Sequence, residues 1–307
     1  MAHCGRWAWN GTDARLKREA SIDIVPGVAR VIVVSDSHLS ERAAGADENW
    51  SSVLRHIGFA RPDLVVHLGD LSLDGANVHG DLEFARSRLD RIMVPWLAVP
   101  GNHDLGDNGG GHGSGHSEID AARRQRWLSL VGPDQWTARL DGWHLIGVNA
   151  QLFGSGLAAE IDQWALLEAA VRDTGAAERL ALVLHKPLAA APEEMAAAPV
   201  YRFVPPDARS RLAELGGARK FDLVLSGHVH QYRHLRRDGR DGATHLWAPA
   251  TWAVLPDYVQ PVVGQKRCGI LELELAAGEE PRHAFIEPDG LLQLTIAVDI
   301  PDPYTAA

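Results

Sequence analysis

Short runs of aliphatic residues recur along the first third of the chain, and each run ends at a polar segment. The first run, Arg30 to Ser35, is rich in β-branched residues, and 64–68 and 96–99 repeat the pattern. Stretches with helical spacing lie between these runs, near 50–60 and 82–91. Continuous apolar runs that alternate with helices are typical of a parallel sheet covered on both faces. The pattern therefore predicts an α/β fold.

The same alternation continues through the middle of the chain. An Ala- and Pro-rich stretch, 189–206, interrupts it and is expected to run over the surface. In order, the further predicted elements are a helix at 119–131, a strand at 144–149, a helix at 160–172, a strand at 180–184, a helix at 209–215 and a strand at 222–226.

From His245 onward the pattern changes to short strands with no helical period between them. This change predicts an antiparallel sheet or hairpins that complete the same domain. The sequence shows neither an internal repeat nor a separate linker. We therefore expect one domain, with an N-terminal extension at 1–29, a core at 30–260 and C-terminal strands at 261–307.

Composition and charge narrow the class of protein. The 307 residues are 46% hydrophobic and 23% charged, and no apolar run approaches the length of a membrane span. Residues 1–29 lack the apolar segment of a secretory signal, and Cys4 and Cys268 are too few for a disulfide framework. We therefore expect a cytoplasmic protein that binds no membrane. The formal net charge of −10 argues against a nucleic acid polymer as a partner.

Side chains that bind metal ions follow the predicted strands. The five segments are Asp36-Ser37-His38, Gly69-Asp70, Gly101-Asn102-His103-Asp104, His185 and Gly227-His228-Val229-His230. A parallel sheet brings its strand ends to one edge, so ligands that are scattered in the sequence converge in space. Carboxylate, imidazole and amide ligands without a thiolate suit divalent Mn, Fe, Zn or Co. Because the ligands are too many for one ion, the sequence predicts a site for two divalent metal ions.

These segments resemble the motifs of the calcineurin-like metallophosphoesterase family, which run DxH, GD, GNH[DE], H and GHxH. Every motif is present in order between Asp36 and His230, over most of the chain. The resemblance implies a four-layer α-β-β-α sandwich, in which helices flank two facing sheets. It also implies how the ligands are shared: Asp36, His38 and His230 bind one ion, Asn102, His185 and His228 bind the other, and Asp70 bridges them.

The reaction that the resemblance implies is hydrolysis of a phosphate ester by in-line attack of a hydroxide that bridges the two ions. His103 would protonate the leaving alkoxide, a role that suits an imidazole near neutral pH. The GNHD form and the absence of an iron-binding Tyr at position 73 make the class III cyclic-nucleotide and glycerophosphodiester phosphodiesterases the most similar branch.

The expected substrate is accordingly a small phosphorylated molecule, a cyclic nucleotide or similar diester. A phosphomonoesterase of the same fold, acting on a phosphorylated metabolite, is the alternative. A second alternative, from a different class of function, is a scaffold for protein contacts that has lost catalysis. The presence of all seven metal ligands and of His103 argues against it.

Two positions depart from the family pattern. Leu73 stands where relatives often carry an acidic or polar residue that orients the catalytic imidazole, so either Asp74 or Asp104 takes this role or both are ordinary turn residues. Lys186 follows His185 where many relatives have a second His. It either contacts a phosphate or extends a solvated stem over the surface.

Several residues near the motifs have two interpretations each. We expect His67 in the core or behind the metal ligands, whereas His112 and His116, beside a Gly-rich loop at 106–115, either contact substrate or bind a stray metal ion. Tyr201, Arg202 and Phe203 either form a wall of the substrate pocket or belong to a plain surface patch. Trp252 lies either at the mouth of the site or in the core. Residues 262–307 can pair with a second copy through an exposed strand, which predicts a homodimer.

Overall fold

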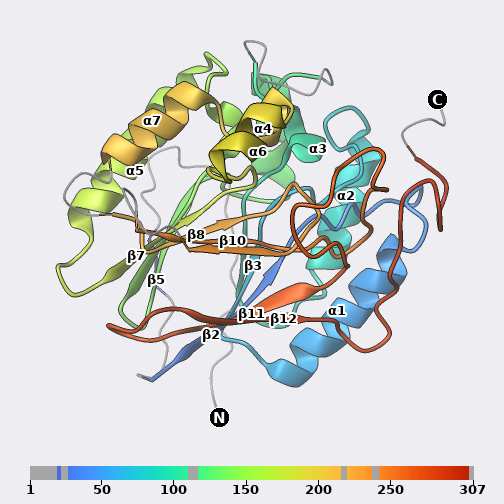
Figure 1. Cartoon of the computed structure of the whole chain (residues 1–307), viewed down its shortest axis with the longest axis horizontal. Helices are drawn as coiled ribbons and strands as arrows, with labels where there is room; N and C mark the ends of the chain where they lie inside the picture. The colour runs from blue at the N-terminus through green and yellow to red at the C-terminus, as the bar shows by residue number, and fades with distance from the viewer. Residues whose placement is uncertain (1–18, 22–26, 110–116, 216–219, 237–241, 304–307) are drawn as a thin grey trace.

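The computed structural model describes residues 19–21, 27–109, 117–215, 220–236 and 242–303. These residues form two mixed β-sheets that lie face to face, with helices on the outer side of each (Figure 1). The seven-stranded sheet has the order β1 (Glu19–Ser21), β5 (Trp136–Leu140), β6 (Trp143–Gly147), β7 (Arg179–Val183), β8 (Leu223–Ser226), β10 (Thr244–Trp247) and β9 (Arg233–Arg236). The five-stranded sheet has the order β12 (Arg282–Ile286), β11 (Ile270–Leu275), β2 (Ala29–Val34), β3 (Leu64–His67) and β4 (Trp96–Ala98).

Helices and 3₁₀ turns connect these strands. The α-helices are α1 (Ala46–Ala60), α2 (His79–Leu89), α3 (Asn102–Leu105), α4 (Ala121–Leu130), α5 (Ala158–Asp173), α6 (Pro192–Ala197) and α7 (Pro206–Leu215). The 3₁₀ turns are η1 (Ala150–Leu152) and η2 (Val200–Arg202). Each predicted helix is present, with boundaries that differ by a few residues.

Alternate side chains of strand β2 point to opposite faces of the sheet, and each face packs against another layer. Val31 and Val33 point to the facing sheet, where they pack in one cluster with residues such as Val183. Ile32 and Val34 point the other way and pack in a cluster with helix residues such as Trp50 of α1. A strand buried on both faces therefore has no polar side, as the sequence shows.

Strand β7 of the seven-stranded sheet shows the same division. Ala181 and Val183 face the five-stranded sheet, whereas Leu180 and Leu182 pack under α5 and α7. Helices α1, α2 and α4 cover the five-stranded sheet on its outer face. The molecule is thus a four-layer α-β-β-α sandwich, and the predicted fold class is confirmed.

Parallel pairing aligns the strands that precede the motifs. In the five-stranded sheet β2 pairs with β3 and β3 with β4, all in parallel. In the seven-stranded sheet β6, β7 and β8 are likewise parallel neighbours. The carboxyl ends of these strands consequently lie together at one edge of each sheet.

Some elements differ from the sequence prediction. Strand β5 was not predicted, although its buried and half-buried residues alternate and the Asp141-Gly142 turn that joins it to β6 is typical of a hairpin. Helix α6 was also missed inside the 189–206 stretch, where Pro192 at its first position is a usual helix start.

The antiparallel pairing predicted for the C-terminal part is present in the five-stranded sheet. Strand β11 pairs antiparallel with both β2 and β12. Strand β10 agrees only in part, since it pairs antiparallel with β9 but in parallel with β8 in the seven-stranded sheet. Residues 291–298 form no strand, and only isolated bridges involve Thr295 and Ile296.

Two further observations concern the surface of the molecule. No helix among the described residues is long and apolar enough to span a lipid bilayer. Strand β12 lies at one end of the five-stranded sheet, so one of its sides is unpaired there. Pairing of two copies through this edge stays a prediction.

Candidate metal centre

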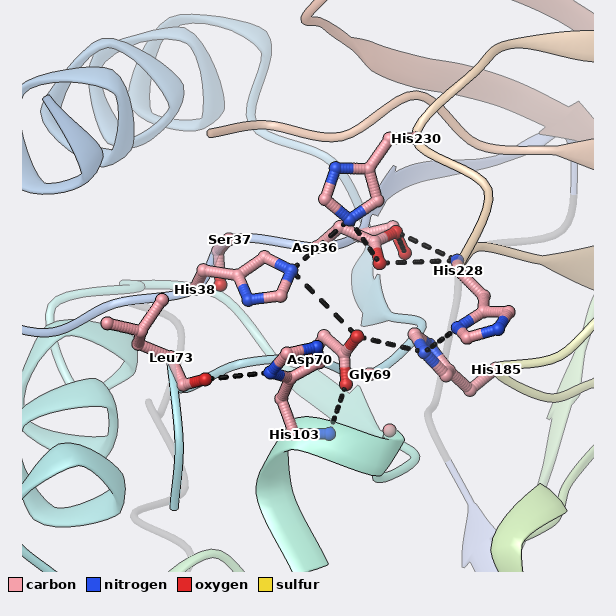
Figure 2. A network of polar contacts seen from close by, with 12 residues as sticks. Asp36, Ser37, His38, Gly69, Asp70, Leu73, His103, His185, His228 and His230 are labelled. Carbon is pink, nitrogen blue, oxygen red and sulfur yellow. Dashed lines mark hydrogen bonds and ion pairs between the residues drawn. The ribbon is translucent and has the colours of Figure 1, made fainter. Parts of the chain in front are cut away.

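All seven predicted ligands lie at the edge where the carboxyl ends of both sheets meet, as Figure 2 shows for six of them. The loops after β2, β3 and β4 supply Asp36, His38, Asp70 and Asn102. The loops after β7 and β8 supply His185, His228 and His230. Both sheets therefore contribute to one site.

One group of ligands gathers around Asp36. Asp36, His38 and His230 each offer a ligand atom within 4.8 Å of the others. The Nε2 atoms of His38 and His230 are 3.2 Å apart, and His230 Nε2 lies 3.4 Å from Asp36 Oδ1. Three donor atoms that converge in this way are suited to one divalent cation.

A second group gathers around Asp70, His185 and His228. His185 Nε2 lies 3.1 Å from Asp70 Oδ2 and 3.2 Å from His228 Nδ1. Asp70 Oδ2 also lies 3.8 Å from His38 Nε2, which belongs to the first group. The Asp70 carboxylate is thus positioned between the two groups.

Backbone carbonyls behind two of the imidazoles determine which ring nitrogen faces the centre. His185 Nδ1 is 2.8 Å from the Leu68 carbonyl oxygen, and His230 Nδ1 is 2.7 Å from that of Ala253. Because a carbonyl can only accept, each Nδ1 donates and the Nε2 lone pair is directed at the centre. This second contact is a usual feature of histidines that bind metal ions.

Asn102 provides an independent test of whether a cation fits. It is the first residue of α3, and its Oδ1 is buried and accepts no hydrogen bond from any residue that the structure describes. A buried amide oxygen without a donor is costly, and a bound cation satisfies it. The residues present therefore fit a metal centre.

Five of the seven candidate ligands adopt a left-handed backbone conformation. Asp36, His38, Asp70, His228 and His230 have φ values between 42° and 68°. Residues with a Cβ atom rarely occupy this region, and each such residue costs about 1–3 kcal/mol. Strain concentrated at these positions is typical of a functional site, because the turns direct the side chains inward at the expense of stability.

Two glycines allow the backbone to approach the carboxylates. A Cβ atom on Gly101 would collide with Asp70 Oδ1, and one on Gly227 would collide with Ser35 Oγ and lie 2.7 Å from Asp36 Oδ2. The neighbouring His228 N–H donates to Asp36 Oδ2 at 3.0 Å. Glycine at these motif positions is thus a steric requirement of the carboxylates.

The electrostatic environment favours the ligand forms of Asp36, His38 and His228. Burial by itself raises the pKa of Asp36, but the nearby His230 lowers this pKa below its ordinary value. Burial lowers the pKa of His38 well below its usual range and that of His228 to about 3. Ionised Asp36 and neutral imidazoles are the states that bind a divalent cation. Although burial opposes it, Asp70 raises the pKa of His185 to about 9, so a cation bound there displaces a proton.

The sequence model of the calcineurin-like phosphoesterase family matches residues 29–232, which include both ligand groups. The chain belongs to this family. It is therefore a phosphoesterase of a family that uses a dinuclear divalent metal centre. No curated protein matches the chain.

Solved structures share the fold of this calcineurin-like phosphoesterase. A dimetal phosphatase from Danio rerio is 14% identical, with a TM-score of 0.53 over 84% of this chain and 99% of that protein. GAP50, the anchor in the inner membrane complex of Plasmodium, is 12% identical, with a TM-score of 0.61 over 86% of each chain. At these identities the likeness shows the fold and carries no information on the substrate.

His103 lies beside the two ligand groups and is oriented by a backbone group. Its Nδ1 is 2.8 Å from the carbonyl oxygen of Leu73, and its backbone N–H donates to Asp70 Oδ1 at 2.8 Å (Figure 2). The ring also contacts that of His38, with 4.7 Å between the centroids. The carbonyl of Leu73 thus orients the imidazole, at the position where relatives often use a side chain.

The two carboxylates considered for that role act elsewhere. Asp104 is buried and accepts hydrogen bonds from the backbone N–H groups of Leu71, Ser72 and Gly101. It closes the turn around α3, while Asp74 accepts from the amide of Asn77. Both are turn residues, which was the other interpretation of the sequence.

The burial and the contacts of Lys186 contradict both interpretations of this residue from the sequence. Its side chain is completely buried, and Nζ donates to Asp107 Oδ1 and, at 2.6 Å, to Asn108 Oδ1. It is therefore neither a solvated stem nor available to a phosphate. The sequence offered no signal for this pair, because Asp107 and Asn108 lie about 80 positions earlier, at the start of the Gly-rich segment.

The structure decides between the interpretations of most remaining candidates. His67 is buried, and its Nε2 lies 2.9 Å from Ser37 Oγ, which places it behind the ligands. Trp252 is a core residue whose ring packs 5.2 Å from that of His38. Tyr201 reaches the centre, with its ring 6.2 Å from that of His228. His112 and His116 lie outside the described residues.

Proposed function

We propose that this phosphoesterase hydrolyses a small phosphodiester, such as a cyclic nucleotide, and that it resembles the class III branch of the family. The single observation that carries the proposal is the convergence of carboxylate, imidazole and amide ligands from both sheets around Asp70. Such an arrangement suits two cations that share one bridging carboxylate.

The proposed ligands are the seven residues predicted from the sequence. One ion is bound by Asp36, His38 and His230, and the other by Asn102, His185 and His228, with Asp70 between them. The grouping is supported by the two clusters around Asp36 and Asp70 and by the unsatisfied oxygen of Asn102. Mn, Fe, Zn and Co all suit this mixture of oxygen and nitrogen ligands.

The bound cations and His103 have different roles in the proposed reaction. When bound, the two cations supply a hydroxide at neutral pH and stabilise negative charge on the phosphoryl oxygens. His103 donates its Nδ1 proton to the carbonyl of Leu73, which leaves Nε2 to hold the proton for the leaving oxygen.

A phosphomonoester is the competing substrate, since the same centre serves both and only the surroundings of the organic group differ. Metal analysis of the purified protein, followed by assays with bis(4-nitrophenyl) phosphate and 4-nitrophenyl phosphate, tests the proposal. We expect two metal ions per chain and a higher kcat/KM for the diester. Absence of bound metal, together with no turnover of either ester when Mn²⁺ or Zn²⁺ is supplied, would refute the proposed enzymatic function. A higher kcat/KM for the monoester would refute the proposal that the substrate is a diester.

A further inference from the structure

A cavity of about 230 Å³ adjoins the turn η2. Its apolar walls include Phe203, Trp247, Pro261 and Val263. The rings of Phe203 and Trp247 contact each other, with 6.2 Å between their centroids. The cavity is therefore a preformed apolar pocket with a partly aromatic wall.

The turn η2 lies between this cavity and the candidate ligands. Tyr201 is on one side, where its ring meets the edge of the His228 ring. The next residue, Arg202, lines the cavity. Val229, which follows His228 in the chain, is buried in one cluster with Phe203 and Trp247. The two neighbours Tyr201 and Arg202 of one short turn thus contact the His228 ring and the cavity, respectively.

The two arginines of the cavity differ in their partners. Arg233 forms a bidentate ion pair with Glu194, at 2.8 and 3.0 Å. Arg202 is half-buried, and its guanidinium makes no ion pair and no hydrogen bond with any residue in the described ranges. A partly desolvated guanidinium without an acidic partner attracts an anionic ligand.

Trp247 adds a second donor that lacks an acceptor. Its Nε1 is buried and has no hydrogen-bond partner among the residues that the structure describes. Its ring also packs under the guanidinium of Arg233, 5.2 Å from the centroid. Because buried donors are normally satisfied, Trp247 Nε1 favours a ligand with acceptor oxygens, as the unpaired charge of Arg202 does.

We propose that this cavity binds the organic group of the substrate, and that Arg202 narrows the proposed small phosphate esters to those whose organic group is apolar and carries an additional negative charge, which the nucleoside of a cyclic nucleotide does not. The inference rests on the proposed function, because it takes the phosphate of the same molecule to lie at the metal centre. Arg202 is accordingly a residue that determines specificity.

The test compares two ligands that differ only in one carboxylate and cannot be hydrolysed. Phenylphosphonate and 4-carboxyphenylphosphonate are titrated calorimetrically into the Mn²⁺-loaded protein. The wild type should bind the carboxylated compound about tenfold more tightly, as expected for one hydrogen-bonded charge pair. The variant Arg202→Met should bind both compounds equally, and Arg202→Glu should prefer phenylphosphonate.

Arg172→Met is the matched control, since it removes an exposed arginine of α5 and should leave the preference intact. Equal binding of the two compounds by the wild type would overturn the inference, as would a preference that survives in Arg202→Met. Hydrolysis of bis(4-nitrophenyl) phosphate by the wild type is measured in parallel. Turnover without a carboxylate preference refutes only the role of Arg202, whereas a preference without turnover refutes only the proposed reaction.

Discussion

At the scale of single residues, hydrogen bonds to backbone carbonyls orient several side chains of the candidate centre. Carbonyl oxygens of Leu68 and Ala253 hold two imidazoles, and that of Leu73 holds His103. Asn102 differs from these residues, because its Oδ1 has no donor among the described residues. Deleting a single side chain should therefore affect either metal content or proton transfer, and the two effects can be separated.

Removal of the Asn102 amide tests its role as a ligand. Asn102→Ala should weaken one of the two metal sites by roughly tenfold or more, because one oxygen ligand is lost. Inductively coupled plasma mass spectrometry after dialysis measures the metal content. Asn77→Ala, which removes an exposed amide, is the control. Full retention of two ions in Asn102→Ala would remove Asn102 from the ligand set.

Replacement of His103 tests the proton transfer. His103→Ala should keep both metal ions but slow hydrolysis of an ester with a poor, alkoxide leaving group by about 10²–10⁴-fold. The loss should be much smaller for a 4-nitrophenyl ester, because that leaving group needs no proton. Comparing kcat for the two esters measures the difference. Undiminished turnover of the alkyl ester would exclude the role of His103 as an acid.

At the scale of elements, the loops that follow the strands are stabilised by close packing and by one buried ion pair. Gly101 and Gly227 let two loops pass against the carboxylates of Asp70 and Asp36. The Lys186–Asp107 pair ties the loop after β7 to the segment after α3. The arrangement of the ligands therefore depends on residues that do not bind metal themselves.

Adding one methyl group to a motif glycine should disturb the site. Gly227→Ala should lower metal occupancy and activity at least tenfold, since the new Cβ collides with Ser35 and the Asp36 carboxylate. Gly58→Ala in α1 meets nothing within 4 Å and should stabilise the protein by up to about 1 kcal/mol. Metal analysis and urea denaturation measure both effects. Normal occupancy in Gly227→Ala would contradict the steric argument.

Breaking the buried ion pair should destabilise the fold. Lys186→Met should lower the free energy of unfolding by about 3–5 kcal/mol, because Asp107 is left buried without a counter-charge. The double variant Lys186→Met with Asp107→Leu should recover much of this loss. Arg282→Met, in an exposed pair with Glu274, should cost less than about 1 kcal/mol. Urea denaturation measures all three, and equal losses in the single and double variants would contradict the mechanism.

At the scale of the whole molecule, the centre joins the two sheets. Four candidate ligands follow strands of the five-stranded sheet and three follow strands of the seven-stranded sheet. The apolar layer between the sheets, which includes Val31, Leu64 and Leu225, holds them in contact. Bound cations therefore stabilise the association of the two halves of the sandwich.

Removal of the metal should lower thermal stability. A cation that binds only the folded state stabilises it by about 2.7 kcal/mol at a concentration one hundred times its Kd. We therefore expect EDTA treatment to lower Tm by several degrees, and Mn²⁺ to restore it in a concentration-dependent way. Differential scanning calorimetry measures the change. Equal Tm values with and without Mn²⁺ would contradict a centre built from both sheets.

The sequence by itself determined the order of most elements and the choice of the candidate metal ligands. Both depend on local patterns: apolar runs predict the strands, and Asp, Asn and His residues follow them at short, fixed spacings. These patterns alone suffice to place the Asp36 and Asp70 segments at strand ends. Strand β5 was not predicted although its alternation is regular, and α6 was missed because its composition resembles that of a loop.

Only the tertiary structure decided what surrounds those ligands. The carbonyl of Leu73 orients His103, whereas one interpretation of the sequence gave this role to Asp74 or Asp104. Lys186 is buried against Asp107, and Arg202 faces a cavity beside Tyr201. These contacts join segments that lie far apart in the sequence or involve backbone atoms, which every residue carries, so no pattern of side chains reveals them. The ligands are consequently local in origin, whereas their orientation and the recognition of substrate depend on long-range packing.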